Sequence, residues 1–137
     1  MRHLLCALAL FVAAPSVVSA QSYVELASYS AVIGAEDFNS STGKRLTALG
    51  DVLQQDRANF FRFGISQPGD APDPFFADRD MRARIPGMVV VFGGAGRLED
   101  LVRAGRPFHV EVLICGTNGQ PAWLGVIPDW IEDRSGC

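Results

Sequence analysis

The chain has 137 residues, with 12 basic and 15 acidic side chains and a formal net charge of −3. This length suits one domain with a single core and is too short for two. The mild negative charge argues against non-specific binding to nucleic acid or to an anionic membrane, because such binding requires clustered positive charge.

Residues 1–20 are typical of a secretory signal peptide. A basic start at Arg2 is followed by an apolar run over 4–14 and by small residues at 18–20, directly before Gln21. The apolar run is too short to span a bilayer, and no later segment approaches the roughly 18 apolar residues that a span needs. We therefore expect a periplasmic or secreted protein with no membrane span after signal removal.

Cysteine usage predicts a covalent link in the exported protein. Removal of residues 1–20 from the 137 leaves 117 residues, with 11 basic and 15 acidic side chains and a charge of −4. Cys6 leaves with the signal peptide, so Cys115 and Cys137 remain in an oxidising compartment. We expect a disulfide between them, and the alternative is two thiols that are free or paired between molecules.

The first part of the domain predicts a strand and a long helix. Residues 22–33 alternate in the manner of a strand. The polar turn 36–43 contains a glycosylation sequon at Asn39, which has meaning only in a eukaryotic secretory route. From 46 to 61, apolar residues fall at helical spacing along one stripe, and Gly64 is a plausible stop.

The middle of the chain predicts a loop, two short helices and a strand. Residues 68–74 hold three prolines and predict a loop, which is where flexible or functional segments concentrate. We expect a short helix at 75–85, a buried strand at 88–92 and a helix at 97–104. The phenylalanines that bracket the loop are expected in the core rather than in a stacking platform; they are Phe60, Phe61, Phe63, Phe75 and Phe76.

The glycines at 93–96, between a strand and a helix, look like the start of a dinucleotide-binding turn. The full spacing fails, however, because the third glycine or alanine position is Glu99, and a carboxylate there would repel phosphate. We therefore expect no cofactor.

The clearest sheet element is a hairpin over 108–127. Asn118-Gly119 is the favoured type I′ turn pair. If these two residues form the turn, Ile114 opposes Trp123. We expect the tail 128–137 to cross the reverse face of the hairpin, held by the disulfide, with Trp130 laid against that face.

The register of that hairpin fixes which side chains share a face. Val110 then opposes Ile127, so Trp123 and Ile127 join the apolar face of the first strand. The whole pattern predicts one α+β domain over 21–137, a small antiparallel sheet of about four strands with two to three helices packed on one face.

His109 is the only histidine of the exported chain, and Glu111 lies on the same side of the predicted strand. With a nearby arginine, such a pair could cleave a phosphodiester by general acid–base catalysis. A histidine at the surface or under the tail is the alternative.

Four carboxylates fall within eleven residues near the proline loop, and calcium favours carboxylate oxygens on loops. They are Asp70, Asp73, Asp78 and Asp80. Nearby arginines could equally neutralise them, giving a solvated loop with weak ion pairs and no metal.

Asp56 lies on or beside the apolar stripe of the long helix, which is unusual for a carboxylate. We expect it to pair with an arginine of the segment 79–84 and so to fix two helices together. A ligand-recognition role for Asp56, Arg57 and Asn59 is the alternative.

The sequence contains no convergent catalytic set, so we expect an exported non-enzymatic binding or accessory protein of unknown ligand, whose partner could be an envelope or extracellular protein. The alternative is a small secreted hydrolase or nuclease that uses His109 and Glu111 as its acid/base pair.

Overall fold

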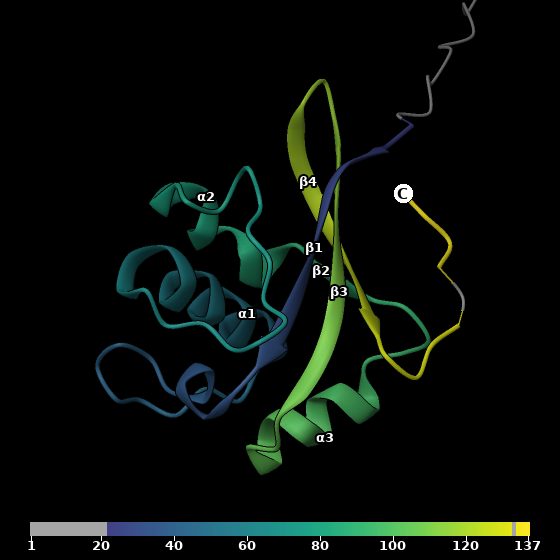
Figure 1. Ribbon diagram of the computed structural model, residues 1–137. Helices are drawn as coiled ribbons and strands as arrows, with labels where there is room; N and C mark the ends of the chain where they lie inside the picture. Colours follow the sequence, from purple (N-terminus) through teal and green to yellow (C-terminus); the bar gives the residue numbers. More distant parts are fainter. Residues whose placement is uncertain (1–21, 133) are drawn as a thin grey trace, which may run out of the picture.

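The computed structural model describes residues 22–132 and 134–137 (Figure 1). The signal peptide predicted at 1–20 and its cleavage site lie outside the described residues. Within the described part of the chain, no helix is long and apolar enough to cross a membrane.

Four strands form one mixed sheet in the order β1-β3-β4-β2. They are β1 (Val24–Ile33), β2 (Val89–Val91), β3 (Phe108–Thr117) and β4 (Gln120–Pro128). β1 and β4 run antiparallel to β3, as expected. β2 is instead parallel to β4, because β4 returns from the hairpin and inserts between β3 and β2.

Three α-helices complete the predicted α+β fold: α1 (Leu49–Ala58), α2 (Arg79–Ala83) and α3 (Gly96–Ala104). The helix predicted over 46–61 begins at Leu49 and continues as the π-helical turn η2 (Asn59–Phe63), which Gly64 ends in the left-handed conformation. The helix predicted over 75–85 is shorter, because Asp78 accepts a hydrogen bond from the Met81 N–H and starts α2 there.

The main core lies between the sheet and the helices. Figure 1 shows α1 and α2 on one side of the sheet and the C-terminal tail on the other. Fully buried side chains of α1 and α3 meet the inward side chains of β3 and β4 in one cluster; they include Val52, Leu53, Leu98, Val102, Val110, Val112, Ile114, Leu124 and Val126. Two short 3₁₀ turns, η1 (Ala35–Phe38) and η3 (Ile85–Gly87), flank α1.

A β-bulge changes the predicted hairpin register. Asn118 and Gly119 both adopt positive φ, as the predicted turn requires, but the register shifts between Cys115 and Gly116. The expectation that Ile114 opposes Trp123 is therefore wrong, since Cys115 opposes Trp123.

One further pair shows the consequence of that shift. Val110 pairs with Pro128 rather than Ile127, so Trp123 and Ile127 leave the main-core face and lie on the reverse face with Cys115. A one-residue slip moves every side chain of a strand to the other face, which is why a single bulge reverses these assignments.

The reverse face carries a second, smaller cluster under the tail. Cys115 and Cys137 form the predicted disulfide pair, with their Cα atoms 5.5 Å apart. Ile131 packs against this cluster. Trp130 does not, contrary to expectation: it packs against the main core, with the Arg97 guanidinium 4.1 Å from its ring centroid.

Candidate functional site

Asp56 and Arg57, near the end of α1, are both buried and form a charged cluster inside the domain. Arg57 Nε donates to the Asp56 carboxylate at 2.8 Å, and its Nη1 donates to the Ala71 carbonyl at 2.8 Å and to the Asp73 carboxylate at 3.4 Å. Asp56 therefore pairs with its own neighbour and not, as expected, with an arginine of 79–84. The cluster fixes the loop that contains Ala71 and Asp73 onto α1.

Aromatic rings enclose this cluster and exclude water from it. The Arg57 guanidinium carbon lies 4.3 Å from the Tyr29 ring centroid and 4.8 Å from that of Phe60. Burial raises the pKa of the Asp56 carboxyl to about 7, although the charge of Arg57 opposes that rise. Within the described residues, Tyr29 Oη and Arg57 Nη2 are buried without a hydrogen-bond partner.

Asn59 opens the π-helical turn and connects it to η1. Its Nδ2 donates to the Asp37 carboxylate at 2.8 Å, and its Oδ1 accepts from Gln55 Nε2 at 2.8 Å. The other Asp37 oxygen accepts the Gly34 N–H, and burial raises the pKa of Asp37. Of the three predicted ligand-recognition residues, Asp56 and Arg57 thus lie in the core, and only Asn59 also reaches a surface hollow.

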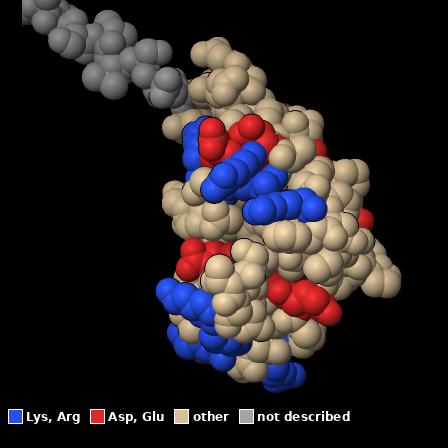
Figure 2. Space-filling view, turned by 90° about the vertical axis from the view of Figure 1, so that its left-hand side faces the viewer, with Lys and Arg blue, Asp and Glu red and all other residues tan. Residues whose placement is uncertain are grey.

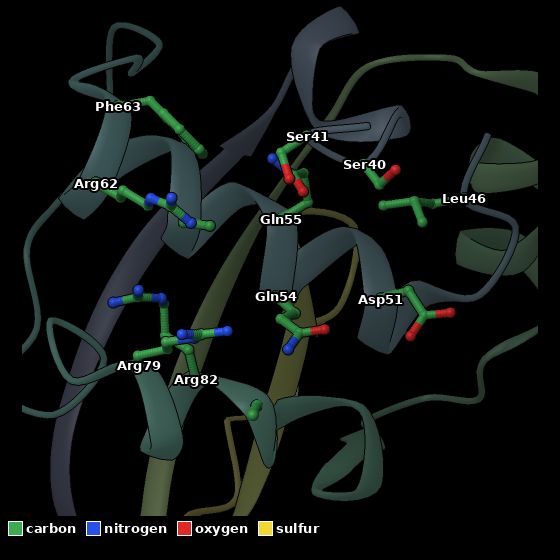
Figure 3. Close-up of a pocket in the computed structure, with 12 residues that line it drawn as sticks. Ser40, Ser41, Leu46, Asp51, Gln54, Gln55, Arg62, Phe63, Arg79 and Arg82 are labelled. Carbon is green, nitrogen blue, oxygen red and sulfur yellow. The ribbon is translucent and has the colours of Figure 1, made fainter. Parts of the chain in front are cut away.

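That surface hollow belongs to a groove along the outer side of α1 and η2 (Figure 3). A first hollow of about 340 Å³ lies between α1, α2 and the turn at Ser40 and Ser41, and a second of about 370 Å³ lies between η1 and η2. The two hollows share Ser40, Ser41, Gln55 and Phe63, so we treat them as one groove.

Arginines form one side of this groove. Figure 3 shows Arg62 of η2 beside Arg79 and Arg82 of α2. The buried Arg82 is held in place by donating from Nη1 to the carbonyls of Phe76 and Ala77, both at 2.7 Å.

The other two arginines of this set are exposed. Arg62 lies with its guanidinium carbon 5.0 Å from the Phe63 ring centroid, and Arg79 has no hydrogen bond or ion pair with another described residue. Asp51 is the one acidic residue among those that line the first hollow. Figure 2, which views this side of the molecule, shows basic side chains gathered on it with acidic ones beside them.

Two exposed apolar side chains lie at the other hollow. Phe63 retains 43% of its surface and Ile65 retains 40%. Phe63 was expected in the core, where Phe76 does lie, but the π-helical turn and the left-handed Gly64 direct it outward. Irregular turns of this kind occur frequently at functional sites.

The predicted acid/base pair lies elsewhere, on the tail side of β3. His109 Nδ1 is hydrogen-bonded to the Asp129 carboxylate, and the Glu111 carboxylate is paired with Arg134 of the tail. His109 retains 38% exposure of its side chain. The structure thus supplies an arginine beside Glu111, which sequence reasoning could not locate.

The structure does not bring the predicted calcium ligands together. Asp70 accepts the N–H groups of Val32 and Gln67, and Asp73 accepts those of Phe75 and Phe76. Asp78 caps α2, as described above, and Asp80 is exposed. Among the described residues, no group of three or more histidine, cysteine, aspartate or glutamate side chains could hold a metal ion.

The groove residues escaped sequence reasoning because they come from three segments that only tertiary packing brings together. The one local signal is that Phe63 and Ile65 flank a helix-ending glycine, where little remains to cover them. No protein-family model, curated protein or solved structure matches this chain.

Proposed function

We propose that this chain is an exported, non-enzymatic binding or accessory protein that holds its partner in the groove beside α1, η2 and α2. The observation that carries the proposal is the groove itself, which combines exposed apolar side chains at Phe63 and Ile65 with the arginines of η2 and α2. Apolar contacts with a few directed polar groups are typical of binding sites.

Hydrogen bonds that hold α1 and η2 to neighbouring segments support this function, because a preorganised site loses less conformational entropy on binding. Arg57 joins α1 to the loop at Ala71, and Asn59 joins η2 to η1. The first connection is partly buried and the second is buried. We infer that Arg57, which lines neither hollow, positions the site without contacting the partner, whereas Asn59 also lines the second hollow.

Export is supported by the predicted signal peptide together with the Cys115–Cys137 pair, since such bonds form in oxidising compartments. Intact-mass measurement of the natural product tests it. The exported chain should begin at Gln21 and weigh two mass units less than its fully reduced form. A natural product that retains residues 1–20, or carries two free thiols, would contradict this part of the proposal.

Site-directed photo-cross-linking tests the groove. A photoreactive phenylalanine analogue at Phe63 should capture an envelope or extracellular protein in the native host, identified by mass spectrometry. The same analogue at Val90, an equally exposed residue on β2, should not. Equal capture at both positions, or capture at Val90 alone, would refute the groove as the binding site.

A second candidate function, a small secreted hydrolase or nuclease, is favoured by one observation. The Asp129 carboxylate engages His109 Nδ1, which would orient the imidazole, while Arg134 beside Glu111 could stabilise negative charge. His109→Ala distinguishes the two functions. Loss of nearly all turnover in a folded His109→Ala protein would establish the enzyme, whereas unchanged partner capture supports the binding protein.

A further inference from the structure

The charge of the groove differs in sign from that of the protein. The whole chain carries −3, yet the groove is lined by three arginines against two acidic residues, Asp51 in the first hollow and Glu36 in the second. Outside the groove, Arg97 and Arg106 also lack an ion-pair partner among the described residues, whereas some other basic groups have one. Arg103, for example, pairs with Glu99 and Asp100 on α3.

The arginines of the groove lack such partners. No carboxylate pairs with Arg62, Arg79 or Arg82 among the described residues, and the only polar contacts of Arg82 are with main-chain carbonyls. A planar guanidinium is well suited to bidentate recognition of a carboxylate. The exposed guanidinium groups of Arg62 and Arg79 are therefore available to an anionic group from outside the molecule.

The groove also offers groups that suit a polypeptide. The Gln54 side chain has no hydrogen-bond partner among the described residues and faces the first hollow, where a main-chain amide could reach it (Figure 3). Phe63 borders both hollows, and its exposed ring can receive an apolar side chain. Figure 3 shows Phe63 next to Arg62, with Gln54 farther along α1 toward Asp51, so the apolar ring and the arginines lie at the same end of the first hollow.

We propose that the occupant of this groove is an extended acidic peptide segment, in which an aspartate or glutamate contacts Arg62 and Arg79 while a nearby apolar side chain packs on Phe63. This inference rests on the proposed binding function and names its ligand class. Charge complementarity selects the acidic partner, and the two joined hollows accommodate a chain rather than one small ion.

Selection of phage-displayed random dodecapeptides on the exported protein tests the proposal. We expect selected peptides to be enriched in aspartate or glutamate next to an apolar residue. Their affinity, measured by fluorescence anisotropy, should fall about tenfold or more in Arg62→Gln and in Arg79→Gln, because each removes a charge-assisted hydrogen bond. Arg106→Gln, an exposed arginine outside the groove, should leave it within about twofold. Added salt should weaken binding to the wild type.

Three results would overturn the acidic-peptide assignment: selected peptides without acidic enrichment, affinities unaffected by the Arg62 and Arg79 substitutions, or no enrichment above a control protein. Competition by micromolar inorganic phosphate would also overturn it, since that would identify a small-anion site. Whether the groove binds a partner at all is tested separately by cross-linking at Phe63, which does not depend on these arginines. Peptides that are not acidic but require Phe63 would leave the binding function standing.

Discussion

Replacing Asp56 by asparagine should remove a large part of the pH dependence of stability. The Asp56 carboxylate is about 1% exposed, and burial raises its pKa from the ordinary 3.8 to about 7. Asparagine is close in shape to the protonated acid, and its Oδ1 can still accept the hydrogen bond from Arg57 Nε. The substitution therefore changes the charge while it preserves the contact.

The sign and size follow from proton linkage. Between pH values near 3.8 and 7, the native state retains the Asp56 proton and the unfolded state has lost it, so stability falls as pH rises, by about 1.4 kcal/mol per unit. The stabilising effect of the bound proton is complete below the unfolded pKa and is lost once the pH exceeds the folded pKa. From about pH 5 to about pH 8.5, Asp56 alone should lower the free energy of unfolding by about 3 kcal/mol.

Urea unfolding at a series of pH values measures this effect. Asp56→Asn should flatten the curve over that interval; burial also raises the pKa of Asp37, which contributes a slope of the same sign where Asp37 titrates. Asp51→Asn, at a half-exposed position of the same helix, is the matched control and should shift the curve without flattening it. Equal slopes in wild type and Asp56→Asn, or wild-type stability that rises with pH, would refute the reasoning.

Three further substitutions test the fold. Joint replacement of Cys115 and Cys137 by serine should lower the free energy of unfolding by about 3 kcal/mol, because the disulfide closes a loop between residues 22 positions apart and so restricts the unfolded chain. Urea unfolding measures this, and an unchanged urea midpoint would contradict it. Gly50→Ala should lower the free energy of unfolding by about 1–3 kcal/mol although alanine has the better helix propensity, because the added Cβ would lie 2.7 Å from the backbone of η3. Gly87→Ala is its control: the added Cβ would meet nothing within 4 Å, so the thermal melting temperature should hardly change. Asp78→Ala should lower the free energy of unfolding by about 1 kcal/mol, because it removes the N-terminal cap of α2. If the variant loses more helical circular dichroism than one short helix contributes, Asp78 does more than cap α2.

The features that could be predicted from the sequence are those fixed by nearby residues. The Asn118-Gly119 turn, the stop at Gly64 and the helix predicted at 97–104 each depend on local backbone preference, and all three form. The disulfide was predictable because only two cysteines lie outside the predicted signal peptide.

The features that escaped prediction depend on distant partners. A Cβ placed on Gly116, at the bulge, would lie 2.0 Å from the Gln120 carbonyl oxygen. This contact between strands cannot be read from the hydrophobic pattern of either strand. In the sequence, Asp37 looks like any acidic residue of a polar turn, because its hydrogen bond with Asn59 forms only in the folded protein. Arg62 and Arg79 belong to different segments, and their common surface exists only once α1 and α2 pack together.

The single sulfur bridge has a consequence for quality control in the cell. A copy made in a reducing environment keeps Cys115 and Cys137 as thiols, and non-covalent contacts then hold the C-terminal segment in place, including those of Trp130, Ile131 and Arg134. When that segment detaches, Trp123 and its apolar neighbours become exposed to water, and exposed apolar surfaces are bound by chaperones and proteases. Oxidation of this cysteine pair therefore distinguishes molecules with a fixed C-terminal segment from molecules that expose this apolar surface.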